Sequence, residues 1–150
     1  MTDPFQFHEK SRAENDPDYR APAEAVDSWF ELAHAVEAEL TRMGFAASVL
    51  READFHPYPT GAQIRVHESH PFGVEISWRA PIMETESYRG KLRAQDAGSP
   101  LLGYVLDTRK VIVEALLDVL AKAGFRTRID HDGSTSYVYR VLEAPLSPLD

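Results

Sequence analysis

The chain has 150 residues, no cysteine and a formal net charge of −8 at pH 7. Its length suits one domain with its own core, and the absence of cysteine excludes thiol catalysis, disulfide cross-links and thiolate metal sites. The negative charge disfavours general affinity for nucleic acid and for anionic lipid.

The ends of the chain differ in composition from its middle. The N-terminal residues lack the regions of a secretory signal, and no apolar run is long enough to span a bilayer, so we expect a cytoplasmic protein without a membrane segment. Residues 1–20 are polar, charged and interrupted by prolines, which predicts a flexible N-terminal arm. Residues 21–143 are expected to form a single α+β domain, and residues 144–150 a proline-limited C-terminal tail.

The first long helix is expected from about residue 22 to residue 43. Pro22 suits the first position of a helix, and apolar residues such as Val36 and Leu40 recur at the spacing of one helical face. Gly44 suits the left-handed position that ends a helix.

Three strands are expected next, over residues 45–55, 62–68 and 72–78. The stretch between the first two contains two prolines, which lack backbone N–H donors, so it must be a loop. The third strand gives the clearest signal, because large apolar residues occupy every second position from Phe72 to Trp78.

The second half of the chain begins with a weak helical pattern within residues 84–97, which Gly90 interrupts. A second long helix is expected over residues 107–123. Two strands follow, over residues 125–130 and 137–142, and turn-forming residues between them predict a hairpin.

The two long helices align without a gap when Gly44 is placed over Gly124, and each glycine is followed by phenylalanine. Residues 64–68 then resemble residues 139–143 in the strands that follow. This similarity predicts an internal α-β-β repeat. The alternative is chance, since an amphipathic helix, a glycine and an aromatic strand often follow one another.

The expected order of elements is α-β-β-β-(α)-α-β-β. Consecutive strands joined by short loops pair antiparallel, and one face of a sheet can shelter both long helices. We therefore predict an α+β two-layer sandwich, with a mainly antiparallel sheet of about five strands and two long helices on one face. This order resembles that of small acidic secretion chaperones and of stand-alone proteins that share their fold; the resemblance lies in element order alone.

The face of the sheet opposite the helices is expected to be rich in arginine. If the alternating apolar residues point inward, five of the twelve arginines point outward together. The predicted partner-binding residues on this face are Arg65, Arg79, Arg126, Arg128, Val138, Arg140 and Leu142. The alternative is a solvated mixed surface in which Glu52, Glu68, Glu75 and Glu143 neutralise the arginines.

Three histidines, His56, His67 and His70, lie between the first and third expected strands. Three histidines with a nearby carboxylate could bind zinc and leave an open position. Their spacing matches no strong metal motif, and loop histidines beside prolines are more often surface residues. They are the weak candidates for a metal site.

No phosphate-binding glycine loop, dinucleotide fingerprint or Gly-x-Ser-x-Gly sequence is present, so we expect no cofactor. We favour a non-enzymatic protein-interaction module, of chaperone-like or adaptor type, that binds a protein partner through the arginine-rich face or a sheet edge and can form a homodimer. One alternative is a nucleic-acid-binding protein that uses the same face; if the phase of the strands is the reverse of the one expected, Trp78, Tyr137 and Tyr139 could stack on bases. The other is a metal-dependent hydrolase at the three histidines.

Overall fold

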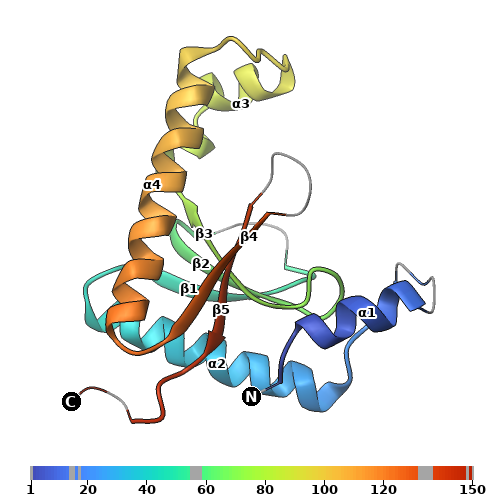
Figure 1. Cartoon of the computed structure of the whole chain (residues 1–150). Coiled ribbons are helices and arrows are strands. Elements are labelled where there is room, and N and C mark those ends of the chain that lie inside the picture. Colours follow the sequence, from blue (N-terminus) through green and yellow to red (C-terminus); the bar gives the residue numbers. More distant parts are fainter. Residues whose placement is uncertain are drawn as a thin grey trace.

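The computed structural model describes residues 2–13, 16, 18–54, 59–131, 137–147 and 149, without the side chains of residues 12 and 13. The order of elements matches the predicted one, with a short helix added at the N-terminus (Figure 1). In chain order the elements are α1 (Phe5–Ala13), α2 (Ala23–Arg42), β1 (Ala47–Arg51), β2 (Gly61–His67), β3 (Gly73–Arg79), the 3-10 helix η1 (Pro81–Glu84), α3 (Glu86–Arg93), α4 (Pro100–Lys122), β4 (Arg126–His131) and β5 (Tyr137–Glu143).

The five strands form one sheet in the order β1-β2-β3-β5-β4. β2 pairs antiparallel with β3, and β5 pairs antiparallel with both β3 and β4. β1 and β2 instead pair in parallel, with Ala47 opposite Ala62, so the expected antiparallel pairing of these consecutive strands is wrong. The reason is the length of their connection, residues 52–60, which can reach about 30 Å and so return along a strand of about 17 Å.

Glycine is required where β1 and β2 begin side by side. Gly61 has φ +103°, and a Cβ there would lie 2.5 Å from the carbonyl oxygen of Ala46. The N–H of the next residue, Ala62, donates to that same oxygen at 2.8 Å. The parallel pair therefore starts with a contact between backbones that a side chain would block.

The two long helices lie on the same face of the sheet, as predicted. α2 packs on β1, β2 and β3, and α4 packs on β3, β4 and β5. The core between the layers contains Trp29, Leu40, Ile64, Ile76 and Leu120, each at most 1 % exposed. Burying a side chain of this size contributes about 1.5–3 kcal/mol before the cost of ordering it.

The two glycines identified in the sequence end the long helices in the same way. Gly44 and Gly124 have φ +99° and +97°. In each case the phenylalanine that follows donates its N–H to the carbonyl five residues earlier, at 2.9 Å and 3.0 Å. These bonds satisfy carbonyls that the end of a helix leaves without an intrahelical partner.

α4 begins at Pro100, earlier than the sequence predicted. Ser99 caps it by accepting a hydrogen bond from the N–H of Leu102, and proline occupies the first turn. The Ser-Pro pair is thus the start signal of the helix. The first part of α4 extends beyond the sheet, with η1 and α3 beside it (Figure 1).

The expected flexible arm, residues 1–20, contains α1. The side chain of Phe7 is 3 % exposed, and its ring lies 5.7 Å from that of Trp29 and 5.8 Å from that of Phe72. The indole N–H of Trp29 also donates to the carbonyl of Thr2 at 2.9 Å. Part of the arm is therefore packed on the core, while its mobility stays a prediction.

The two parts of the chain that resemble each other share an order of helix, strand and strand, but their strands pair in opposite senses. β1 and β2 are parallel, and β4 and β5 are antiparallel. The internal repeat therefore stays a hypothesis. No helix among the described residues is long and apolar enough to cross a membrane.

Candidate functional site

We use the term reverse face for the side of the sheet opposite α2 and α4. Cross-strand pairing places Arg65 opposite Glu75, Glu75 opposite Arg140, and Arg140 opposite Arg128. Directly opposed residues point to the same face of a sheet. These side chains therefore share the reverse face, as the alternation in the sequence indicates.

Arg140 is nevertheless buried, with 2 % of its surface exposed. Its Nε donates to Asp130 Oδ2 at 2.7 Å, its Nη2 donates to the carbonyl of Pro71 at 2.7 Å, and its Nη1 donates to the carbonyl of Phe72. Burial lowers the pKa of Arg140, while the hydrogen bond and charge of Asp130 raise it. The side chain thus connects β5 to β4 and to the turn that precedes β3.

The N-terminal segment covers this buried arginine. The ring of Phe5 lies 4.5 Å from the guanidinium carbon of Arg128 and 5.1 Å from that of Arg140. Pro4 lies so close to Gly73 that a Cβ on the glycine would be 2.9 Å from the proline Cβ. The expectation of an exposed arginine at position 140 is wrong, because the chain's own N-terminal segment lies over it.

Two other residues predicted to bind a partner are also interior. Val138 and Leu142 are each 8 % exposed. Arg126 and Arg128 do lie at the surface, with 60 % and 57 % of their side chains exposed. Each of these arginines lies within 4 Å of an acidic group, which is Glu143 for Arg126 and Asp130 for Arg128.

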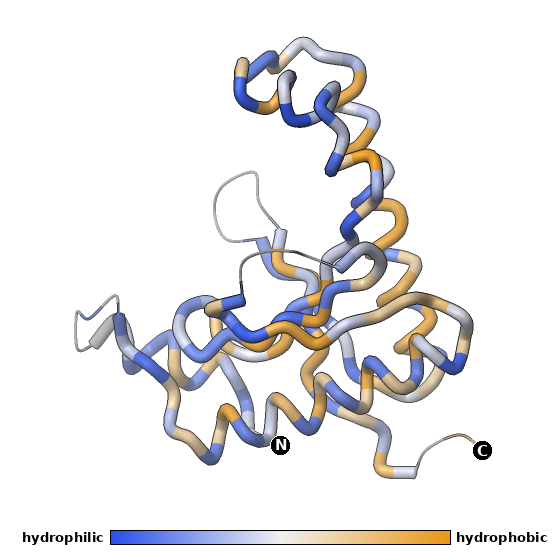
Figure 2. The backbone as a smooth tube through the Cα atoms, turned by 180° about the vertical axis from the view of Figure 1, so that it is seen from behind, coloured by the Kyte–Doolittle hydropathy of each residue, from blue (hydrophilic) through white to orange (hydrophobic). Residues whose placement is uncertain are grey.

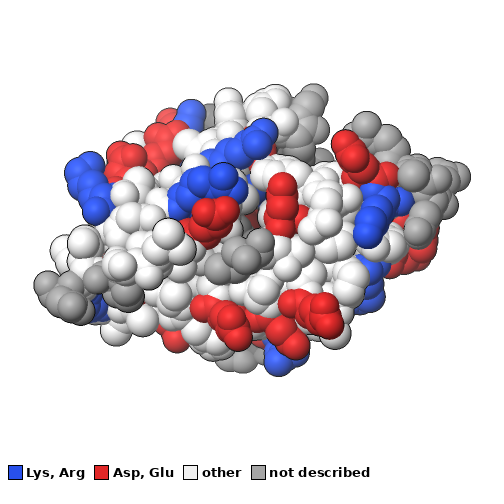
Figure 3. Space-filling view, turned by 60° about the horizontal axis from the view of Figure 1, so that its bottom comes forward, with Lys and Arg blue, Asp and Glu red and all other residues white. Residues whose placement is uncertain are grey.

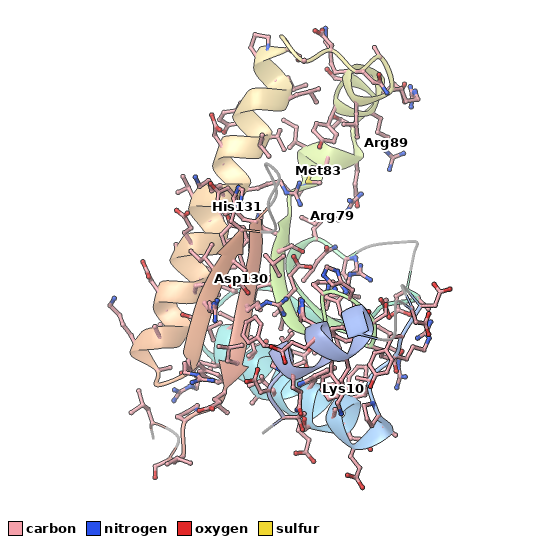
Figure 4. All side chains as sticks on the ribbon, turned by 45° about the vertical axis from the view of Figure 1, so that its right-hand side comes forward. Lys10, Arg79, Met83, Arg89, Asp130 and His131 are labelled. Carbon is pink, nitrogen blue, oxygen red and sulfur yellow. The ribbon has the colours of Figure 1, made fainter. Side chains whose placement is uncertain are left out.

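The remaining two predicted residues lie elsewhere on the sheet. Arg65 donates from Nη1 to the carbonyl of Arg51 at 2.8 Å. Arg79 lies 3.7 Å from Glu84, at the end of β3 beside η1 and α3, whereas Asp130 lies on β4 (Figure 4). On the side of the molecule that carries α2, which Figure 3 turns forward, the acidic and basic side chains that the structure describes are also intermixed. The seven residues do not form one cationic surface.

The histidines predicted as weak metal ligands have other neighbours. Nε2 of His67 lies 2.8 Å from Oε1 of Glu75, and the ring of His70 lies 4.9 Å from that of His8. His56 lies outside the described residues. Among the residues that are described, no group of three or more potential ligands is placed to hold a metal ion.

A different site arises where β3 and β5 separate. Within the described residues, the pairing of these neighbouring strands is limited to Val74 with Val141 and Glu75 with Arg140. β3 pairs with β2 along its whole length, and β5 pairs with β4 back to its first residue. The second half of β3 and the first part of β5 therefore diverge inside the sheet.

The divergence opens a cleft of about 620 Å³, which we call the β3–β5 cleft. Two strands form its walls and α4 forms its floor. Its lining residues are Glu75, Ile76, Ser77 and Trp78 of β3, Leu106, Asp107, Arg109, Lys110 and Val113 of α4, and Tyr137 and Tyr139 of β5. The volume lies within the usual range of ligand-binding sites, about 300–1,000 Å³.

Leu106 belongs to the core-facing apolar stripe of α4, but the sheet does not cover it. Its spacing from Val113, Leu117 and Leu120 places all four on one side of the helix. The last three are at most 3 % exposed, whereas Leu106 is 66 % exposed. The hydrophobic colouring continues along the part of α4 that projects from the sheet (Figure 2). An apolar stripe thus extends past the point where the sheet stops covering it.

Basic and aromatic groups meet within the cleft. Nε of Arg109 donates to the carbonyl of Trp78 at 2.9 Å, and Nζ of Lys110 lies 5.3 Å from the ring centre of Tyr137. Burial raises the pKa of Tyr139, and the charges of Glu114 and Tyr137 raise it further. The cleft therefore offers apolar, aromatic and cationic contacts side by side.

The sequence gives a partial signal for this site. Counting back seven residues from Val113 reaches Leu106, which a helix starting at Pro100 would include in its apolar stripe. Trp78 and Tyr139 are partly buried and pack against the hydrophobic core. Nothing in the local pattern indicates that β3 and β5 separate, because their separation depends on contacts between segments far apart in the sequence.

Comparison of the chain with protein-family models, with curated proteins and with solved structures finds no match.

Proposed function

We propose that the protein is a non-enzymatic interaction module that takes an extended segment of a partner protein into the β3–β5 cleft. The observation that carries the proposal is the parting of two neighbouring strands above an uncovered apolar stripe of α4. An open strand edge offers backbone donors and acceptors to an added strand. This proposal keeps the predicted use of a sheet edge and replaces the arginine-rich face with the cleft.

The backbone of β3 supports this mode of binding. The carbonyl of Trp78 accepts its hydrogen bond from Arg109, a residue of α4 that lines the cleft, so this carbonyl points toward the cleft. Backbone groups alternate between the two edges of a strand, so the N–H of Trp78 and the carbonyl of Ile76 face the same way. A peptide lying beside β3 would pair with these groups.

The side chains around the cleft indicate the character of the segment. In an extended peptide, alternate side chains point to opposite faces. One set would point toward α4, where Leu106 and Trp78 provide apolar surface. The partner segment is therefore expected to carry apolar residues at every second position, a pattern by which added strands are recognised.

The test uses two exposed apolar residues on the same helix. Leu106 is 66 % exposed and lines the cleft, while Val111 is 65 % exposed and lies outside it. Partners are captured from a cell extract with the immobilised full chain, and the affinity of the identified partner is then measured with purified proteins. Leu106→Asp should weaken binding at least about tenfold, which corresponds to about 1.4 kcal/mol. Val111→Asp should leave the affinity within about twofold.

Equal effects of the two substitutions would remove the cleft as the binding site. Both variants must keep the circular dichroism spectrum of the parent chain, which their exposure makes the expected result. A partner that binds the two variants and the parent alike would contradict the proposal even if binding itself is strong.

A second candidate function, binding of single-stranded nucleic acid, is favoured by the aromatic and cationic lining of the same cleft. Trp78, Tyr137 and Tyr139 could stack on bases while Arg109 and Lys110 contact phosphates. The net charge of −8 acts against it. Binding of a fluorescent oligonucleotide that falls steeply with added salt would support this function, and absence of binding at low salt would exclude it.

A further inference from the structure

β4 forms one edge of the sheet, and no other described strand lies beyond it. Exposed edge strands pair with other chains unless charge, proline or a cover prevents it. Ile129, in the middle of β4, is 47 % exposed although its position in the strand alternation points to the core side. An exposed β-branched residue at the centre of an edge strand is a feature that a second strand would cover.

The charges along β4 are arranged antisymmetrically about this residue. Arg128 precedes Ile129, and Asp130 follows it. When two copies of β4 pair antiparallel with Ile129 at the centre, each Arg128 lies opposite Asp130 of the second copy. The two Ile129 side chains then lie opposite each other. Opposite charges and β-branched pairs at directly facing positions both stabilise antiparallel strands.

Neighbouring registers are less favourable. A shift of the pairing by one residue would set core-side residues opposite reverse-face residues, which the pleat of the sheet opposes. A pairing centred on Arg128 places two arginines face to face, and one centred on Asp130 places two aspartates face to face. Of these registers, the one centred on Ile129 is without a pair of like charges.

We propose that β4 is a dimerisation edge, and that two copies of the chain join by antiparallel pairing of β4 centred on Ile129. The two five-stranded sheets then form one continuous sheet with both copies of α4 on the same face. Within one copy Asp130 already lies 2.6 Å from Nε of Arg128 and 2.7 Å from Nε of Arg140. The second copy adds a further arginine to each aspartate. This interface does not involve the β3–β5 cleft and does not depend on the function proposed for it.

Cysteine cross-linking tests both the interface and its register, and the chain contains no cysteine that would interfere. In Ile129→Cys the two introduced Cβ atoms lie about 4.5–5.5 Å apart, a separation that small adjustments bring within reach of a disulfide. Thr127→Cys is the matched control, because it lies on the same strand and the same side of the sheet. Its two copies are displaced by four residues, or at least about 13 Å.

Mild oxidation of the purified full chain should convert Ile129→Cys to a covalent dimer at low micromolar concentration and leave Thr127→Cys uncross-linked. Equal cross-linking of the two variants would overturn the register. Failure of Ile129→Cys to cross-link, in a chain that sediments as a dimer, would overturn the assignment of the interface to β4.

Sedimentation equilibrium of the unmodified chain supplies the second measurement. A monomer at every concentration examined would overturn the proposal outright. Where the chain is a dimer, Ile129→Lys should raise its dissociation constant at least about tenfold, because two ammonium groups then meet at the centre of the interface. Leu92→Lys is the control, since Leu92 is 54 % exposed and lies on α3, away from the sheet. An equal effect of both lysines would contradict the proposal.

Discussion

The α2-β1-β2 and α4-β4-β5 segments share one local pattern and differ in how the rest of the chain covers them. The buried residues of α2 run from Ala25 to Leu40, along almost the whole helix. Those of α4 run from Val113 to Leu120, with only Val105 buried before them. The sheet and the N-terminal segment together cover the first helix, whereas the second extends past the sheet (Figure 1).

An apolar stripe on a helix forms a core only where other elements cover it. The stripe of α2 meets three strands, while the stripe of α4 passes over the point where β3 and β5 diverge. Apolar surface that the chain leaves uncovered in this way is available to another molecule. The same pattern thus stabilises the fold in one segment and is proposed to bind a partner in the other.

The largest loss of stability is expected on substitution of Arg140, which joins β4 and β5 to the turn before β3. Arg140→Met should lower the free energy of unfolding by about 3 kcal/mol or more, since the buried carbonyl of Phe72 and Oδ2 of Asp130 lose their donor. Arg128→Met, which removes an exposed arginine from the same Asp130, should cost less than about 1 kcal/mol. Urea denaturation of the two variants measures both values.

A similar loss for both arginine variants would show that burial of Arg140 contributes nothing beyond its ion pair. A smaller loss of stability in Arg140→Met than in Arg128→Met would contradict the role given to the buried side chain.

The next prediction compares one leucine from each helix. Leu32 of α2 is 1 % exposed and Leu106 of α4 is 66 % exposed. Leu32→Ala should destabilise the fold by about 2–5 kcal/mol, because it removes buried methyl groups and leaves a cavity. Leu106→Ala should change stability by no more than about 0.5 kcal/mol. Thermal unfolding checks both, and a large loss for Leu106→Ala would mean that α4 is covered in solution.

The glycines that end the two helices allow a closer comparison. Alanine at either position meets the same left-handed backbone, which costs about 1–2 kcal/mol. A Cβ at Gly44 has nothing within 4 Å, whereas a Cβ at Gly124 would lie 2.9 Å from that of Pro145. Gly124→Ala should therefore cost more than Gly44→Ala in chemical denaturation. Equal costs would show that the C-terminal segment moves aside without penalty.

The smallest expected effect is a pH dependence of stability that arises at His8, in α1. Burial lowers the pKa of His8, as do the charges of Arg140 and His70, while its hydrogen bond to Pro71 and the charge of Asp130 raise it. Since the unfolded chain then binds a proton more readily than the folded chain, stability is complete above the unfolded value and falls as the pH drops below about 6.5.

His8→Gln should reduce this loss, because glutamine keeps a donor for the carbonyl of Pro71 and does not titrate. Comparing denaturation midpoints at about pH 7.5 and about pH 5.5 tests the prediction. An unchanged pH dependence in the variant would assign the effect to another group.

The parts of the fold that the sequence predicted depend on short-range patterns. Alternation from Phe72 to Trp78 indicated β3, and the glycines at 44 and 124 indicated the helix ends. The inward phase of β2 and β3 followed from the same alternation, and that of β5 followed from its resemblance to β2 in the internal repeat.

The incorrect predictions have a different cause, which is contact between segments that lie far apart in the sequence. β1 and β2 pair in parallel through the connection between them, which a rule for short loops does not foresee. Arg140 becomes buried because Phe5 and the carbonyls of Pro71 and Phe72 come together over it. The cleft forms because β5 leaves β3 after Glu75, and no residue near Glu75 signals that departure.

Amide hydrogen exchange at β3, followed residue by residue by NMR, shows whether β3 and β5 are separated beside the cleft. The N–H of Ser77 belongs to the edge that pairs with β2, and the N–H of Trp78 faces the cleft. In the chain alone, the Trp78 amide should exchange much faster than the Ser77 amide, and it should become protected when a partner segment binds. Equal protection of the two amides in the chain alone would show that β3 and β5 remain joined, and would contradict the account.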